Sequence, residues 1–348
     1  MSKQAEAVIP EPAANPHLVG HLRAETRILE AMTSGRMHHA WLMSGPRGIG
    51  KATLAFRFAR FLLAHGARPP EGAESLHVPP EHPVFHTVSA GANADLFVLR
   101  REEDPKTKRL RAIINAADAR KAAHFLSMTA AGGGWRVVIV DAADDMNPAA
   151  ANAILKTLEE PPANSVFLMV SHSPGRLLPT IRSRCLHLPM RPLSQAQVRE
   201  ALSLIGEGMD SAALERAAAL SGGSPGRALK LATSKAAELF SRFADMALAA
   251  PPYDRVVTQT ICGALGGARN LDDFNLFRDL LGEWITARAR QAAAHGHARE
   301  AGRWAALSAE AARLLARVES FNLDRGQALA ILFSRAEAIA REAMANMS

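Results

Sequence analysis

The sequence predicts an α/β domain with a parallel sheet, followed by a small helical lid and an all-α C-terminal domain. Up to Pro192, short and almost wholly apolar segments alternate with stretches of helical periodicity. Apolar strands of this kind are typical of a parallel sheet that helices cover on both faces. After Pro192 the strand pattern ends, and apolar residues recur only at helical spacing.

The elements follow from this periodicity in chain order. The expected strands are 40–43, 96–99, 136–140, 166–170 and 185–188. The expected helices are 18–32, 52–63, 116–127, 148–158, 195–205, 211–220 and 226–246, with several more between 256 and 343. Residues 66–91 are rich in Pro, Gly and His without a clear period and are predicted to form an inserted loop.

These elements divide the chain into four parts. Residues 1–15 are rich in Ala, Pro and Glu and are expected to be a disordered lead-in. Residues 16–192 form the α/β domain, 193–250 the lid and 251–348 the C-terminal helical domain. The Pro251-Pro252 pair is a suitable hinge between the last two.

Composition restricts the class of protein. No apolar stretch approaches the roughly 20 residues of a membrane span, and the N-terminus lacks the pattern of an export signal, so a cytoplasmic protein without membrane contact is expected. The two cysteines, Cys185 and Cys262, cannot form a disulfide framework, which fits a reducing compartment. A net charge of +7 permits contact with nucleic acid, but the arginines are scattered among alanines without a basic run interleaved with aromatics.

The main motif is a glycine-rich phosphate loop between the first expected strand and the helix after it. It consists of Gly45, Pro46, Arg47, Gly48, Ile49, Gly50 and Lys51. In such a loop, backbone N–H groups and a helix N-terminus face the phosphate oxygens while the lysine supplies a positive charge. Ala52 stands where the pattern has the hydroxyl that binds magnesium, and Thr53 comes one residue too late. A working site for ATP or ADP and an inherited, empty loop both remain open.

A second motif is the apolar strand that ends in Asp141, which suits contact with a metal-bound water. ATPases with this strand normally carry a carboxylate next, to position the attacking water, but here the residue is Ala142. Asp144 and Asp145 follow in a predicted turn and are expected to cap the next helix. The missing hydroxyl and the missing carboxylate are independent losses, and both argue against hydrolysis.

Residues 147–162 (NPAAANAILKTLEEPP) followed by 181–185 (IRSRC) closely resemble the clamp-loader ATPases of the AAA+ class. The resemblance covers most of the first 230 residues, including 38–41 before the phosphate loop and 223–229 in the lid. The degenerate loop and strand look like those of a clamp-loader subunit that is not a motor.

The resemblance implies roles for particular residues. Arg184, in the serine-arginine-cysteine motif, is implied to enter the ATP site of an adjacent subunit and act there in trans. Ser171 occupies the position of a polar sensor, whereas Gly226 stands where motor subunits have a sensing arginine, and Arg227 comes one position later. Cys185 is expected to be a small buried packing residue.

The resemblance also implies partners and cofactors. The partners are the motor and delta subunits of a loader, and through the complex the sliding clamp and primed DNA; the C-terminal domain is implied to be an oligomerisation collar. The family often carries a four-cysteine zinc module after the phosphate-loop helix, but residues 65–86 contain no cysteine, so no zinc is expected. Their histidines, at irregular spacing, are His65, His77, His82 and His86.

Three alternatives differ in class. An active motor ATPase requires Thr53 and Asp144 to replace the missing groups. A small-molecule P-loop kinase requires an acceptor pocket and a base, and the sequence shows neither. A simple DNA-binding module predicts strongly salt-dependent binding of primed DNA.

Overall fold

The computed structural model describes residues 10–104, 108, 110–131, 134–205, 209–249, 251–267, 270–321 and 323–345. The chain forms two compact units, one of residues 1–208 and 221–229 and the other of residues 209–220 and 230–348. The predicted lid, residues 193–250, is thus divided between the two units, and the division into a lid and a collar remains a prediction.

The first unit is built on a five-stranded parallel sheet with the order β2-β3-β4-β1-β5. The strands are β1 (Ala40–Ser44), β2 (Leu96–Arg100), β3 (Arg136–Asp141), β4 (Ser165–Ser171) and β5 (Leu186–Pro189). β1, β3 and β4 are buried along nearly their whole length, because helices cover both faces. The predicted fold class is confirmed.

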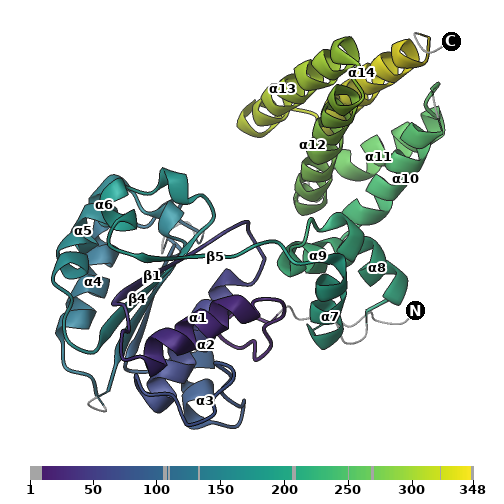
Figure 1. The fold of residues 1–348 in the computed structure, drawn as a ribbon. Coiled ribbons are helices and arrows are strands. Elements are labelled where there is room, and N and C mark those ends of the chain that lie inside the picture. The colour runs from purple at the N-terminus through teal and green to yellow at the C-terminus, as the bar shows by residue number, and fades with distance from the viewer. Residues whose placement is uncertain are drawn as a thin grey trace. The chain divides into compact units, whose positions relative to one another are not determined.

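Two groups of helices cover the sheet (Figure 1). On one face lie α1 (Leu22–Thr33), α2 (Lys51–His65) and α3 (Pro83–Ser89); on the other lie α4 (Ala116–Ser127), α5 (Pro148–Glu159) and α6 (Pro179–Arg182). Successive side chains of β3 alternate between the two cores, with Ile139 on the α2 side and Val140 on the α5 side. Short 3₁₀ turns, η1 (Ala143–Asp145) and η2 (Pro174–Arg176), follow β3 and β4.

The helices after β5 are α7 (Gln195–Ile205), α8 (Ser211–Leu220), α9 (Pro225–Ala232), α10 (Ala236–Leu248), α11 (Arg255–Gly266), α12 (Leu271–Ala294), α13 (Ala298–Phe321) and α14 (Arg325–Ala345). The second unit packs around Phe243 of α10, whose ring stacks on Phe333 of α14 at 4.8 Å and meets Trp284 of α12 edge-on at 5.0 Å. Of the apolar positions predicted in α12, Leu280 and Leu281 are buried, whereas Leu276 and Trp284 are half-buried.

Three expectations about elements differ from the structure. The first helix begins at Leu22, four residues later than predicted, and the predicted loop 66–91 contains α3. The helix predicted over 226–246 is two helices, because Ser234 accepts a hydrogen bond from the Ala236 amide and donates to the Leu231 carbonyl. In the described part of the chain, no helix has the length and apolar character to cross a membrane.

Candidate functional site

The predicted phosphate loop connects β1 to α2, and its lysine is turned back onto it. Lys51 begins α2 and is only 3% exposed. Its Nζ donates to the carbonyl of Gly45 at 2.7 Å and to the carbonyl of Pro46. These two contacts use two of the three N–H donors of the ammonium and leave one for a phosphate oxygen.

Burial also shifts the pKa of this lysine. It lowers the pKa of Lys51 to about 8, although Asp141 and Asp144 act to raise it. Burial raises the pKa of Asp141, at the end of β3, while the positive charge of Lys51 opposes this shift. The carboxylate of Asp141 and the ammonium of Lys51 stabilise each other in a partly desolvated site.

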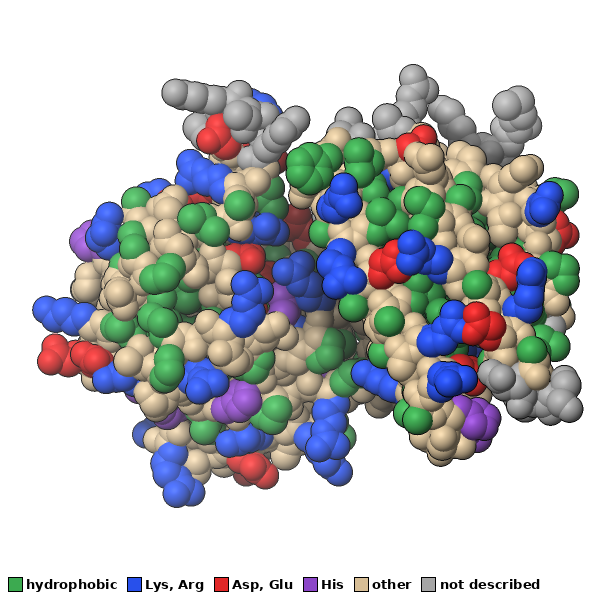
Figure 2. Space-filling model, turned by 90° about the horizontal axis from the view of Figure 1, so that it is seen from above, with side chains coloured by type: hydrophobic (Ala, Val, Ile, Leu, Met, Phe, Trp, Pro, Cys, Tyr) green, Lys and Arg blue, Asp and Glu red, His purple; other side chains and the backbone are tan. Residues whose placement is uncertain are grey.

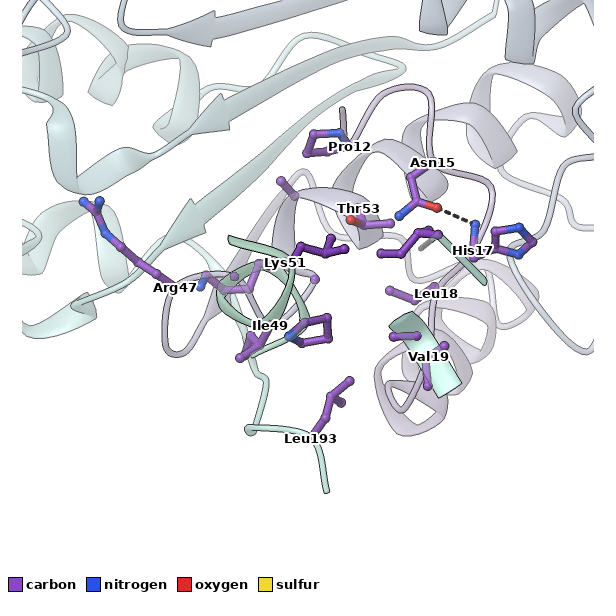
Figure 3. Close-up of a pocket in the computed structure, with 18 of the residues that line it drawn as sticks. Pro12, Asn15, His17, Leu18, Val19, Arg47, Ile49, Lys51, Thr53 and Leu193 are labelled. Atoms are coloured by element: carbon purple, nitrogen blue, oxygen red, sulfur yellow. Dashed lines mark hydrogen bonds between the residues drawn. The ribbon is translucent and has the colours of Figure 1, made fainter. Parts of the chain in front are cut away.

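A cavity of about 340 Å³ lies beside the loop, within the first unit. Figure 3 shows that Arg47 extends away from the other labelled residues, while Asn15, His17, Leu18 and Val19 form a wall opposite. The cavity is lined by Pro10, Pro12, Asn15, His17, Leu18, Val19, residues 47–53, Asp141, Val170, His172, Leu193, Ala201, Ile205, Pro225, Gly226 and Leu229. An apolar enclosure next to a phosphate loop suits a nucleotide base.

The wall formed by residues 10–19 (the wall segment) is fixed by two arginines of α2. Arg60, 1% exposed, donates from Nη1 to the Ala13 carbonyl at 2.7 Å and from Nη2 to the Asn15 carbonyl at 2.9 Å. Arg57 donates to the Pro16 carbonyl at 2.9 Å. The prediction of a disordered lead-in is therefore wrong for residues 10–15; residues 1–9 lie outside the described residues.

Arg57 also joins a buried polar network. Its Nε donates to Glu25 of α1 at 2.6 Å, and the same carboxylate oxygen accepts the Leu76 amide at 3.1 Å. His77 Nδ1 lies 3.3 Å from the Arg57 guanidinium. This network ties the 66–82 stretch to α1 and α2. No group of three or more His, Cys, Asp or Glu suited to a metal occurs among the residues that the structure describes.

Ala52 and Thr53 both line the cavity, on the first turn of α2. Ala52 presents a methyl group at the position of the magnesium-binding hydroxyl. One residue further along a helix turns a side chain by about 100 degrees, so Thr53 does not present its hydroxyl in the same direction. The site therefore offers the loop and the lysine but no hydroxyl ligand at the usual position.

Asp144 is fully engaged in holding the end of β4. It accepts hydrogen bonds from Ser171 Oγ at 2.9 Å and from the amides of His172 and Ser173 at 2.5 and 3.0 Å. Burial acts to raise the pKa of Asp144, but these hydrogen bonds outweigh it and leave the pKa below its ordinary value. The expectation that Asp144 caps a helix is wrong, since the α5 cap is Asn147, whose side chain accepts the Ala150 amide at 2.8 Å.

Ser171, the predicted sensor, is fully buried, does not line the cavity and donates to Asp144. The neighbouring His172 lines the cavity instead. Burial, together with Lys51 and Arg47, lowers the pKa of His172 to about 4, so its ring is neutral near pH 7.

The start of α9 contacts the phosphate loop through its backbone. The Gly226 amide donates to the Gly48 carbonyl at 3.0 Å. A Cβ at Gly48, where φ is +73°, would lie 2.4 Å from Ser224 Oγ, and a Cβ at Gly226 would lie 3.2 Å from the Gly48 Cα. The approach therefore favours glycine at position 48, where φ is positive, and leaves little room for a Cβ at position 226.

Arg184, the residue implied to act in trans, does not line this cavity. It follows α6, and its side chain is 33% exposed. Nη1 donates to the Thr180 carbonyl at 2.9 Å, and Nη2 lies 2.6 Å from Glu159 Oε1. Cys185 beside it is buried, as expected, and burial raises the pKa of its thiol to about 12.

Several residues that shape the site were not found from the sequence. His21 holds the loop through a 2.6 Å hydrogen bond between its Nε2 and the Ile49 carbonyl, and burial lowers its pKa. Arg57 and Arg60 belong to an α2 pattern that reads as an ordinary amphipathic helix. The available signal was the position of these two arginines within the apolar stretch 54–63.

The sheet order, the phosphate loop and the strand ending in Asp141 define a P-loop domain of the AAA+ class. Residues 20–194 match the family model described as DNA polymerase III, delta subunit. The chain belongs to this family.

Individual relatives agree with this assignment. The chain is 40% identical to DNA polymerase III subunit delta' of Pseudomonas aeruginosa over 193 residues, covering 56% of this chain and 55% of that protein. It is 36% identical to DNA polymerase III subunit delta' of Escherichia coli over 206 residues, covering 59% and 58%. The match thus spans less than two thirds of these relatives. A solved gamma subunit-related protein of Thermotoga maritima is 17% identical with a TM-score of 0.45, covering 92% of this chain and 100% of that one.

Proposed function

We propose that the chain is a non-hydrolysing subunit, or stator, of a bacterial clamp loader in the cytoplasm, in the role that its relatives' name, delta', denotes. It donates Arg184 to the ATP site of a neighbouring motor subunit, and a delta subunit is a further partner in the same assembly. The complex then loads a sliding clamp onto primed DNA. ATP hydrolysis takes place in the site of the neighbouring motor subunit.

The state of the chain's own site supports the absence of hydrolysis. Ala52 removes the magnesium-binding hydroxyl, and Ala142, 3% exposed, removes the carboxylate that would position water. Asp144, the substitute that a motor ATPase would need, already accepts three hydrogen bonds at the end of β4. The cavity and Lys51 remain, so a nucleotide such as ATP or ADP has room there without a route to hydrolysis.

One observation carries the role in trans: Arg184 is partly exposed and is held at the surface, away from the cavity of its own chain. A guanidinium supplied in this way stabilises the charge that develops on the transferred phosphoryl group. Its backbone is fixed on both sides by buried side chains, Ile181 and Cys185. A side chain on such a support enters a neighbouring site with little loss of conformational freedom.

Direct DNA binding by the isolated chain has less support. On the face drawn in Figure 2, basic side chains are spread over the surface with acidic ones among them. An affinity for primed DNA that falls steeply with salt would favour a DNA-binding module instead.

The test is clamp- and DNA-stimulated ATP turnover by the reconstituted loader containing Arg184→Ala. The matched control is Arg182→Ala, since Arg182 is exposed in the same motif. We expect Arg184→Ala to lower turnover by roughly 10³-fold or more with assembly intact, and Arg182→Ala to leave it near wild type. Unchanged turnover with Arg184→Ala refutes the trans mechanism. ATP turnover by the isolated chain would favour the motor ATPase.

A further inference from the structure

The guanidinium of Arg184 is held by acceptors from two different helices. Glu159, the last residue of α5, lies 2.6 Å from Nη2, and the Thr180 carbonyl of α6 accepts from Nη1 at 2.9 Å. The Glu159 side chain is 48% exposed and that of Arg184 is 33% exposed. The contact is therefore well formed, yet water and an incoming ligand can reach it.

Nearby charged residues of the same motifs differ from this pair. Arg182 lies two positions before Arg184 and is exposed, and Glu160 follows Glu159 and is also exposed. The structure shows no ion pair for Arg182 or Glu160 in the part of the chain that it describes. Of these two arginines, Arg184 is the one for which the described residues provide acceptors to the guanidinium.

We infer that Glu159 is a positioning residue for Arg184: it holds the guanidinium in one orientation before the neighbour's phosphate arrives. The inference rests on the proposed function of Arg184. A free arginine side chain populates many rotamers and loses this freedom on binding, whereas a side chain already held in place loses less. Glu159 acts through Arg184 and does not itself touch the nucleotide.

The geometry leaves the guanidinium able to bind a phosphate. Of its five N–H donors, the two contacts use one on each Nη, and three remain. Because Glu159 is half exposed, its hydrogen bond exchanges with solvent at little cost and yields to a phosphate oxygen of higher charge. A deeply buried carboxylate at this position would instead keep the guanidinium from binding a phosphate oxygen.

The experiment measures kcat and KM of the reconstituted loader with Glu159→Ala, Glu159→Gln and Glu160→Ala, each checked for assembly and thermal stability. Glutamine keeps an oxygen acceptor at the same distance, and Glu160→Ala removes a neighbouring carboxylate that does not contact Arg184. We expect Glu159→Ala to lower kcat about threefold to tenfold with KM within about twofold of wild type. Glu159→Gln is expected to restore most of this loss, and Glu160→Ala to match wild type.

A second arm combines Glu159→Ala with Arg184→Ala. If Glu159 acts only through the arginine, the double variant has the turnover of Arg184→Ala alone. A further loss in the double variant, or wild-type kcat in Glu159→Ala while Arg184→Ala is severely impaired, overturns the positioning inference and leaves the proposed function intact. Wild-type turnover in both single variants overturns the proposed function itself.

Discussion

The buried ion pair between Glu25 and Arg57 gives the sharpest stability prediction. The two side chains are 7% and 10% exposed, and the Glu25 oxygen also accepts the Leu76 amide. Replacing Glu25 with alanine leaves Arg57 buried without its counter-charge, and breaking one partner of a buried pair costs about 3–5 kcal/mol. The exposed pair Arg100–Glu11, at 3.7 Å with side chains 62% and 71% exposed, supplies the matched control in the same unit.

For a unit of this size, the loss corresponds to a fall in Tm on the order of 10 °C. Hydrogen–deuterium exchange of the β3 and β4 amides measures the free energy of opening of the first unit by itself, independently of the helical unit. Glu11→Ala should change that free energy by at most about 1 kcal/mol. A cost of Glu25→Ala no larger than that of Glu11→Ala would refute the reasoning.

Three further predictions concern the cavity and the loop. Ala52→Ser adds the missing hydroxyl, so the variant should bind ADP more tightly in the presence of magnesium than in EDTA, as measured by calorimetry. The wild type should bind ADP equally in both. Magnesium dependence in the wild type contradicts this prediction. The pKa of His172 is 6.5 in the unfolded chain and about 4 in the folded one, so the folded state binds fewer protons and stability is lost as the pH falls from 6.5 to 4. His172→Asn should therefore flatten a plot of Tm against pH over this range. An unchanged slope contradicts the prediction. Gly48→Ala should lower Tm more than the control Gly35→Ala, because both glycines have positive φ but only a Cβ at Gly48 would meet another residue. Gly48→Ala should also speed hydrogen exchange of the Gly226 amide. Equal effects of the two variants would show that the contact between Gly48 and Gly226 does not contribute to stability.

The sequence predicted the sheet and its motifs well because both are local signals. Apolar runs such as Arg136–Asp141 form buried parallel strands wherever helices cover both faces. Glycine-rich turns between a strand and a helix are equally local, so the loop ending at Lys51 was placed correctly. The role of Arg184 in trans came from the resemblance to clamp loaders and remains a prediction.

What the sequence did not predict depends on contacts between distant residues. Residues 1–15 looked disordered because they are rich in Ala, Pro and Glu, but Arg60, more than 40 positions later, binds the carbonyls of Ala13 and Asn15. Asp144 looked like a helix cap because it precedes a helix, yet its partners lie in the turn after β4, 27 or more positions away. No pattern of spacing within one element reports such pairings.

The contact between Gly48 and Gly226 has a consequence for how closely α9 approaches the phosphate loop. Motor relatives are implied to carry a sensing arginine where this chain has Gly226, and any side chain there would push against the Gly48 backbone. The spacing between α9 and the loop is thus set backbone to backbone, with the Gly226 amide donating to the Gly48 carbonyl. A side chain at position 226 would have to displace the Gly48 backbone by a few tenths of an ångström.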